Sequence, residues 1–149
     1  MSAEDAARLE SYQPALNDAP RLQDVQFLED QINAYNIACT GRDDGKELSF
    51  FFRDQDGQVT GGLYGWTWAG WLEVRFLWLR EDLRGQGRGR SLLQAAEAEA
   101  LRRGCTHALL DSYSFQAPDF YKKLGYQEFG LLEGFPAEHS RHFLWKELG

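Results

Sequence analysis

A stretch rich in glycine and arginine, Leu83 to Arg90, carries the residues of this chain best suited to bind an anion. Its alternating glycines allow left-handed and close-approach backbone conformations, so successive N–H groups can converge on a phosphate. Residues 91–103 follow with a helical pattern, whose N-terminus adds a positive dipole. The predicted phosphate loop consists of Arg84, Gly85, Gln86, Gly87, Arg88, Gly89 and Arg90.

Spacing within this stretch separates the classes of phosphate loop. A nucleotide-triphosphatase loop ends in Gly-Lys-Ser/Thr, whereas this chain has Gly89-Arg90-Ser91 and lacks the lysine. A dinucleotide fingerprint that began at Gly85 would need a third glycine at the position of Arg90, and it usually lies in the first strand–helix unit. Both classes are disfavoured. A glycine-rich surface turn with solvated arginines stays open as the alternative.

Two apolar runs are expected to position the loop. Residues 71–79 precede it, and residues 106–110 follow the helix. A strand that follows a crossover helix normally lies parallel to the strand before it, so these two runs should be adjacent and parallel. Residues 48–53 and 59–68 flank the hairpin signal Asp54-Gln55-Asp56-Gly57 and should complete an antiparallel meander with residues 71–79.

The remaining elements are expected at both ends of the chain. A short strand is expected at residues 12–16, and helical spacing from Leu22 should end at Gly41. Pro118 suits the first turn of a short helix that stops at Gly125. Residues 126–131 and 142–148 should then add antiparallel strands, which gives an α+β domain with a mixed, mostly antiparallel sheet.

Length and composition restrict the class of protein. A chain of 149 residues has the size of one domain, so we predict a single domain over residues 1–149. We expect a soluble, cytoplasmic protein with no membrane partner, because no apolar run is long enough to cross a bilayer and the start lacks signal-peptide features. Cys39 and Cys105 form no metal or disulfide motif. The formal net charge of -7 argues against nucleic acid as a partner and is compatible with a cationic amine, although such a charge is common in soluble proteins.

Two motifs resemble those of a known family. Arg84-x-x-Gly87-x-Gly89 is similar to the Gln/Arg-x-x-Gly-x-Gly/Ala signature of the GNAT superfamily of acyl-CoA N-acyltransferases. Ala117-x-x-x-Tyr121-x-x-x-Gly125-Tyr126 resembles its C-terminal pattern Asn-x-x-Ala-x-x-x-Tyr-x-x-x-Gly-Phe. The order and separation of the motifs also match, so the resemblance covers about residues 48–148. One position departs from the pattern, because Ser114 stands where the family has asparagine.

The resemblance implies a GNAT fold and an acetyl-CoA site without a metal. The fold is a twisted, mostly antiparallel sheet whose central parallel pair splays at a bulge, flanked by about four helices. The pantetheine amides would pair with the main chain near Leu77 and Leu79. The pyrophosphate would lie on the N–H groups of Gln86 to Arg90, and the Ser114 hydroxyl could still contact the cofactor.

The same resemblance implies roles for two catalytic residues. Tyr121 resembles the family's general acid for the departing CoA thiolate, and its ordinary pKa of about 10 lies not far above that of a thiol, about 8.5. Glu73 resembles the catalytic glutamate of histone-acetylating members, and burial beside Trp66 and Trp71 would raise its pKa. A solvated carboxylate at this position, with ordered water as the base, stays open as the alternative.

The predicted function is transfer of an acetyl group from acetyl-CoA to a primary amine of a small-molecule or protein acceptor. Transfer should be direct, in a ternary complex, because neither cysteine matches a nucleophile motif. A non-catalytic CoA-binding or dimeric regulatory module is the alternative. Alternating Tyr64, Trp66 and Trp68 could line an acceptor pocket or pack in the core or in a homodimer. Asp111 and Tyr113 could face the acceptor, and their role stays open.

Overall fold

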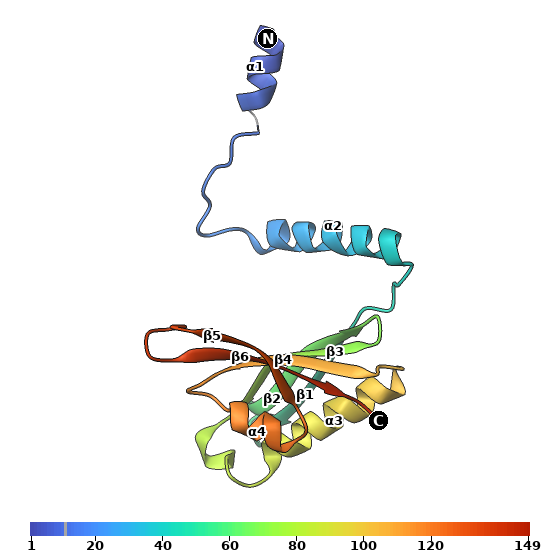
Figure 1. Cartoon of the computed structure of the whole chain (residues 1–149), viewed down its shortest axis with the longest axis vertical. Helices are drawn as coiled ribbons and strands as arrows, with labels where there is room; N and C mark the ends of the chain where they lie inside the picture. Colours follow the sequence, from blue (N-terminus) through green and yellow to red (C-terminus); the bar gives the residue numbers. More distant parts are fainter. Residues whose placement is uncertain (11) are drawn as a thin grey trace. The chain divides into compact units, whose positions relative to one another are not determined.

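A computed structural model of the chain describes residues 1–10 and 12–149 (Figure 1). Its described residues divide into two compact units, residues 1–41 and residues 42–149, which are considered separately. The prediction of one domain over the whole length therefore stays a prediction.

Two helices make up the regular structure of the first unit, α1 (Ala3–Glu10) and α2 (Leu22–Thr40). The predicted helix from Leu22 is confirmed, and it ends at Gly41, which adopts a left-handed φ of 68° and donates its N–H to the Ile37 carbonyl. The strand predicted at residues 12–16 was wrong, because this segment is irregular. Pro14 at its centre lacks the N–H group that a strand ladder requires.

A single six-stranded sheet organises the second unit, with strand order β1-β2-β3-β4-β6-β5. Only β3 and β4 are parallel, and every other neighbouring pair is antiparallel, so the mixed sheet and the α+β class are confirmed. The strands are β1 (Lys46–Arg53), β2 (Val59–Trp68), β3 (Trp71–Leu79), β4 (His107–Tyr113), β5 (Gln127–Glu133) and β6 (Ser140–Glu147).

The turns of the β1–β2–β3 meander use the residues that the sequence indicated. Gly57 closes the first hairpin with a φ of 78°. Ala69 and Gly70 close the second, with φ values of 51° and 84°. Positive φ at both central positions matches the twist of the flanking strands, so the predicted meander is confirmed.

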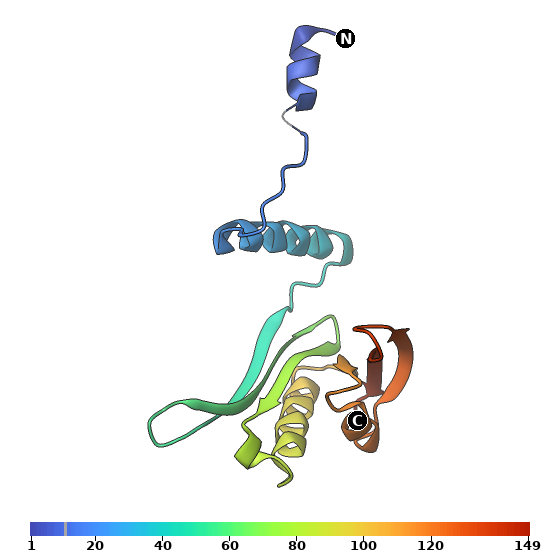
Figure 2. The ribbon, with the colours of Figure 1, turned by 90° about the vertical axis from the view of Figure 1, so that its left-hand side faces the viewer.

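Helices cover one face of this sheet. After the short 3-10 turn η1 (Glu81–Leu83), α3 (Arg88–Arg102) packs against β1, β2 and β3 (Figure 2). The helix α4 (Pro118–Lys123) has proline at its first position, as expected, and contacts β4. With α1 and α2 the described residues contain four α-helices, in agreement with the expected number.

The hydrophobic core lies between the sheet and α3. It combines the inward residues of the strands with one stripe of the helix, which begins at Leu92 and Leu93. The largest side chains that are buried completely are Leu63, Leu72, Leu93 and Leu144. This core fixes the strands from which the candidate site is built.

Candidate active site

The parallel strands β3 and β4 pair over three positions only, from Trp71 with His107 to Glu73 with Leu109. Beyond this point residues 74–79 and 110–113 pair only with their outer neighbours, β2 and β6, within the described residues. The expected splay of the parallel pair is therefore present. It leaves main-chain groups unpaired along both inner edges.

A bulge in β3 accompanies the splay. Tyr64 faces Phe76 while the next residue of β2, Gly65, faces Val74, so Arg75 is the extra residue. A Cβ on Gly65 would lie 2.1 Å from the Glu73 carbonyl oxygen, hence only glycine permits this close approach. Gly65 thus permits the close approach of β2 and β3 at the bulge.

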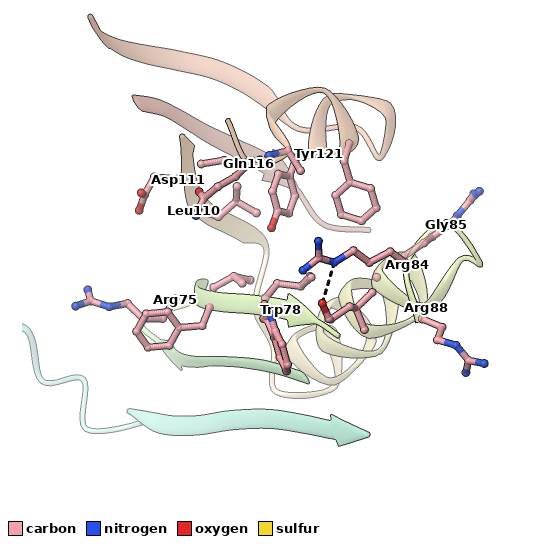
Figure 3. Close-up of a pocket in the computed structure, with 18 of the residues that line it drawn as sticks. Arg75, Trp78, Arg84, Gly85, Arg88, Leu110, Asp111, Gln116 and Tyr121 are labelled. Carbon is pink, nitrogen blue, oxygen red and sulfur yellow. Dashed lines mark hydrogen bonds between the residues drawn. The ribbon is translucent and has the colours of Figure 1, made fainter. Parts of the chain in front are cut away.

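A cavity of about 800 Å³ fills the space between the separated strands. Its walls come from β3, from the glycine-rich loop with the start of α3, from β4 and from the segment leading into α4 (Figure 3). The lining residues predicted from the sequence are Leu77, Leu79, Arg84, Gly85, Gly87, Arg88, Gly89, Arg90 and Tyr121. Nine predicted site residues therefore meet around one cavity, whereas Gln86, Glu73 and Ser114 do not line it.

The glycines of the loop differ in their surroundings. Gly85 and Gly87 have φ values of 71° and 78°, and a Cβ on either would meet no atom within 4 Å. They are needed for backbone conformation and leave open space above the loop. Gly89 lies in the first turn of α3, where a Cβ would come within 3.4 Å of Phe120 and 3.6 Å of Leu79. A Cβ here would make ordinary van der Waals contacts with these two side chains.

The side chains of the loop differ in direction. Arg84 reaches across the cavity and donates from Nε to the Leu79 carbonyl oxygen at 2.9 Å, whereas Arg88 extends outward from α3 (Figure 3). The Gln86 side chain turns back and donates to the Asp82 carbonyl oxygen at 3.1 Å. Open space above the loop, the N-terminus of α3 and the nearby arginines together fit a diphosphate group.

Tyr121 stands on α4 with its hydroxyl directed into the space between the two strands (Figure 3). The side chain is 8% exposed, and burial, aided by the negative charge of Asp111, raises its pKa to about 12. The hydroxyl is therefore protonated at neutral pH. It can donate a proton or a hydrogen bond, but it cannot act as a base there.

A second tyrosine supports Tyr121 from behind. The ring of Tyr126 meets it edge to face at 5.9 Å between centroids. The Tyr126 hydroxyl is buried and has no hydrogen-bond partner among the described residues. Burial raises its pKa beyond the usual range for tyrosine. Tyr126 thus packs against the candidate acid and does not face the cavity.

Glu73 occupies the last paired position of β3, immediately before the splay. The side chain is half-buried, and burial raises its pKa; the Arg75 cation opposes this shift and Asp111 adds to it. The sequence predicted a raised pKa at this position, and the structure agrees in direction. The role of Glu73 as base stays a prediction.

Two serines near the end of β4 differ in their surroundings. The exposed Ser114 accepts a hydrogen bond at Oγ from the Ser140 N–H at 3.0 Å. This bond links the residue after β4 to the first residue of β6. Ser112 is 2% exposed, lines the cavity and accepts at Oγ from the Ala117 N–H at 3.2 Å. The predicted contact of Ser114 with the cofactor stays a prediction, and Ser112 is the serine that faces the cavity.

Asp111 is a cavity residue whose role the sequence left open. Its Oδ2 accepts a hydrogen bond from Arg141 Nε at 2.8 Å. The Arg141 guanidinium lies 5.0 to 5.6 Å from the ring centroids of Tyr113, Phe135 and Phe143. Other lining residues that sequence analysis did not identify include Ser112, Phe115, Gln116 and Phe120. A signal existed for these four, because they lie within or just before the motif that contains Tyr121.

The remaining candidates lie outside the cavity. Tyr64 and Trp66 are half-buried on β2, where their rings contact each other and Tyr64 stacks on Phe76. Cys105 is buried with a raised pKa and does not line the cavity, whereas Cys39 is exposed and belongs to the first unit. In the part of the chain that the structure describes, no cluster of histidine, cysteine and acidic residues could hold a metal, and no helix has the length and apolarity needed to span a membrane.

Comparison with known proteins defines the class. The Acetyltransferase (GNAT) family matches residues 9–126, so the chain belongs to this family and is an acetyltransferase. The Agrobacterium fabrum protein named Acetyltransferase Atu2258 is 36% identical over 132 residues, which cover 89% of this chain and 95% of that protein. The Blasticidin-S acetyltransferase of Streptomyces morookaense is 38% identical over 93 residues, covering 62% of this chain and 68% of that one. The crystal structure of an Agrobacterium tumefaciens acetyltransferase, 35% identical, superposes with a TM-score of 0.84 over 91% of this chain and 99% of its own.

Proposed function

We propose that this acetyltransferase transfers the acetyl group of acetyl-CoA to a primary amine, directly and within a ternary complex. The observation that carries the proposal is the course of the cavity, which runs from the glycine-rich loop between β3 and β4 to Tyr121. One end suits a phosphorylated donor, and the protonated hydroxyl of Tyr121 lies further along the cavity. This arrangement matches the two halves of an acyl-CoA, a charged diphosphate and a thioester.

The residues around the cavity fit acetyl-CoA as the donor. Gly85 and Gly87 leave room for the diphosphate, and Arg84 supplies positive charge. The unpaired inner edges of β3 and β4 can hydrogen-bond the amides of pantetheine as a missing strand would. Leu77 and Leu79 lie on that edge of β3, so we retain them as the main-chain contacts.

The reaction requires one bond to form and one to break. The neutral amine nitrogen attacks the thioester carbonyl carbon, the carbon–sulfur bond breaks, and the thiolate takes a proton from Tyr121. A lysine-like amine with a pKa of about 10.4 is mostly protonated at neutral pH, so a group near the splay must first accept its proton. We assign this step to Glu73, whose raised pKa brings it closer to the working range.

Direct transfer is supported by the position of Cys105 and by the lack of a nucleophile motif around either cysteine. A covalent acyl-enzyme would need a nucleophile in the cavity, and Cys105 does not line it. Burial also raises the pKa of Cys105, which disfavours its thiolate. A sequential order of donor and acceptor binding is therefore the expected kinetic pattern.

We infer that the acceptor is a small basic molecule. The relative named Blasticidin-S acetyltransferase supports a small-molecule acceptor, and the acidic composition of the chain is compatible with a cationic one. Blasticidin S is accordingly the first acceptor to test. Homodimer formation and a cytoplasmic location stay predictions of the sequence.

A panel of primary amines tests the proposal. The protein is incubated with acetyl-CoA, a thiol reagent and each amine in turn, with blasticidin S and lysine-like alkylamines included. We expect thiol release that depends on the amine and saturates with it. CoA binding without amine-dependent thiol release on the whole panel would instead favour a non-catalytic CoA-binding module.

A further inference from the structure

Two carboxylates stand on either side of the splay and on the same face of the sheet. Glu73 is in register with Leu109, and Asp111 follows Leu109 by two residues along β4. Side chains alternate along a strand, so Glu73, Leu109 and Asp111 share one face. The buried neighbours Val74 and Leu110 point to the opposite face, toward the core. The carboxylates therefore flank the point at which the two strands separate.

The charges of the cavity are distributed unevenly along its length. Arg84 and Arg88 lie at the glycine-rich end, whereas Asp111, the acidic residue of the lining, lies at the other end together with Arg75, with Tyr121 between the two ends (Figure 3). A donor whose diphosphate occupies the arginine end brings its reacting end toward the carboxylates. The acceptor nitrogen must reach this same place.

An arginine lies near each of the two carboxylates, Arg141 beside Asp111 and Arg75 beside Glu73. Arg141 binds Asp111 through Nε and is held over aromatic rings. Arg75 lines the cavity, and its guanidinium lies 5.9 Å from the ring centroids of both Trp66 and Phe76 and extends to the side away from the glycine-rich loop (Figure 3). The Asp111 side chain is still 36% exposed. A single neutralising contact leaves oxygen lone pairs of Asp111 available to a ligand.

We propose that Glu73 and Asp111 together form an ammonium subsite that selects primary alkylammonium acceptors without a neighbouring anionic group. Two like charges across a gap repel each other, and a cation placed between them relieves the repulsion and gains charge-assisted hydrogen bonds. Asp111 binds the ammonium through its carboxylate, and Glu73 takes the proton that must leave before attack. The inference rests on the proposed function and deepens it.

The proton balance of the reaction is complete with these groups. The bound ammonium gives one proton to Glu73, and the nitrogen then forms its bond to the acyl carbon. The nitrogen loses a second proton as the amide forms, while the departing sulfur takes one from Tyr121. Glu73 returns its proton to solvent, and Tyr121 is reprotonated by the proton that left the nitrogen. The sum is one ammonium and one thioester converted to one amide, one thiol and one released proton.

A pair of amines with the same carbon chain tests the subsite. n-Butylamine is a cation at neutral pH, and gamma-aminobutyrate carries an additional carboxylate. Ligand-observed NMR titration into the protein saturated with CoA measures their affinities without turnover. We expect n-butylamine to bind at least tenfold more tightly, and Asp111→Asn to weaken it by about tenfold or more, as the loss of one charge-assisted hydrogen bond predicts. Asp56→Asn, which removes the same charge at the tip of the first hairpin, should leave the affinity unchanged.

The outcomes separate the subsite from the proposed function. Equal affinities of the two amines, or an unchanged affinity in folded Asp111→Asn, would overturn the subsite even if other amines are acetylated. If no amine of the panel causes thiol release but n-butylamine still binds more tightly than gamma-aminobutyrate, the transfer reaction is overturned and the subsite is retained. If Asp111→Asn does not fold, salt dependence replaces it: the wild-type affinity for n-butylamine should fall steeply between low and physiological ionic strength. Affinity that is independent of salt would contradict the subsite.

Discussion

The Nε atom of Arg84 donates a hydrogen bond to the backbone carbonyl oxygen of Leu79 at 2.9 Å. The first residue of the glycine-rich signature is thereby attached to the last residue of β3, and both residues line the cavity. This contact fixes the loop relative to the strand edge that is proposed to bind pantetheine. A guanidinium has further N–H groups, which can contact a phosphate at the same time.

Replacement of Arg84 should therefore weaken donor binding through both geometry and charge. We expect Arg84→Met to raise the Kd for CoA about tenfold or more, as measured by isothermal titration calorimetry, because a hydrogen bond to a charged group is lost. Arg53→Met is a matched control, since Arg53 also donates to a backbone carbonyl, that of Gly57, at 3.1 Å. An equal loss of affinity in both variants would show that the effect of Arg84 is not specific to the loop.

Gly87 should be essential for binding but not for folding. Gly87 and Gly57 have the same φ of 78°, and a Cβ on either meets no atom within 4 Å. Valine at either position should therefore cost a similar free energy of unfolding, on the order of 1–2 kcal/mol. Only Gly87→Val should abolish CoA binding, because its side chain would occupy the space expected for the diphosphate. Unchanged CoA affinity in a folded Gly87→Val protein would remove the assignment of this loop.

Tyr121 should contribute to the rate and not to donor affinity. We expect Tyr121→Phe to lower kcat by about a hundredfold or more, the usual contribution of a general acid, with little change in the KM for acetyl-CoA. Since burial raises the pKa of Tyr121 to about 12, wild-type kcat should show no alkaline loss from this group at neutral or mildly basic pH. Retention of wild-type kcat by Tyr121→Phe across the accessible pH range would exclude the role of acid.

Tyr126→Phe is the control for Tyr121→Phe, since it removes a tyrosine hydroxyl from a ring that packs against Tyr121 but does not line the cavity. It should keep kcat. It should also leave the free energy of unfolding unchanged or increase it, because the Tyr126 hydroxyl is buried without a partner among the described residues. Chemical denaturation and a turnover assay of the two variants together separate chemistry from packing.

Glu73 should determine the acid side of the pH profile. A base works when deprotonated, and burial places the pKa of Glu73 above its ordinary value, so wild-type kcat/KM should fall as pH decreases toward that pKa. Glu73→Gln should reduce kcat/KM most at neutral pH and differ least from wild type in acid. A constant ratio of the two proteins at every pH would argue for ordered water as the base.

The same shift predicts an opposite effect on stability. A carboxyl group with a raised folded-state pKa stabilises the protein below its unfolded pKa, and this contribution is lost as pH rises through the folded value. Glu73→Gln should therefore gain Tm relative to wild type as pH is raised from acid to neutral. A variant that is less active and more stable is the behaviour expected of a functional carboxylate.

Much of this architecture could be predicted from local sequence signals. Gly87, Pro118 and Gly125 mark helix boundaries through backbone preferences that depend on a few neighbours only. Tyr121 could be predicted because its motif surrounds it. What could not be predicted depends on contacts between residues far apart in the sequence. The hydrogen bond from the Ser140 N–H to Ser114 Oγ joins residues that are 26 positions apart, and it forms because β4 pairs with β6. The strand expected at residues 12–16 does not form, because a short apolar segment needs a neighbouring strand to pair its backbone N–H and C=O groups.

A last prediction concerns the ion pair behind the candidate acid. Lys146 Nζ lies 2.5 Å from Glu97 Oε1, and it also lies 5.5 Å from the centroid of the Tyr126 ring. Glu97 is 8% exposed, so removal of the lysine charge would leave a nearly buried carboxylate without its partner. We expect Lys146→Met to lower the free energy of unfolding by about 2 kcal/mol, less than for a fully buried pair because the lysine side chain is 27% exposed.

The double variant Glu97→Gln/Lys146→Met should recover part of that loss, since it removes the uncompensated charge, and the cycle then gives the coupling between the two side chains. Lys122→Met serves as the comparison, because Lys122 pairs with Glu128 at 3.6 Å on a more exposed surface and should change the unfolding midpoint little. If Lys146→Met proved as mild as Lys122→Met, the pair would act as a surface pair. It would then make no special contribution to the packing of Tyr126 against Tyr121.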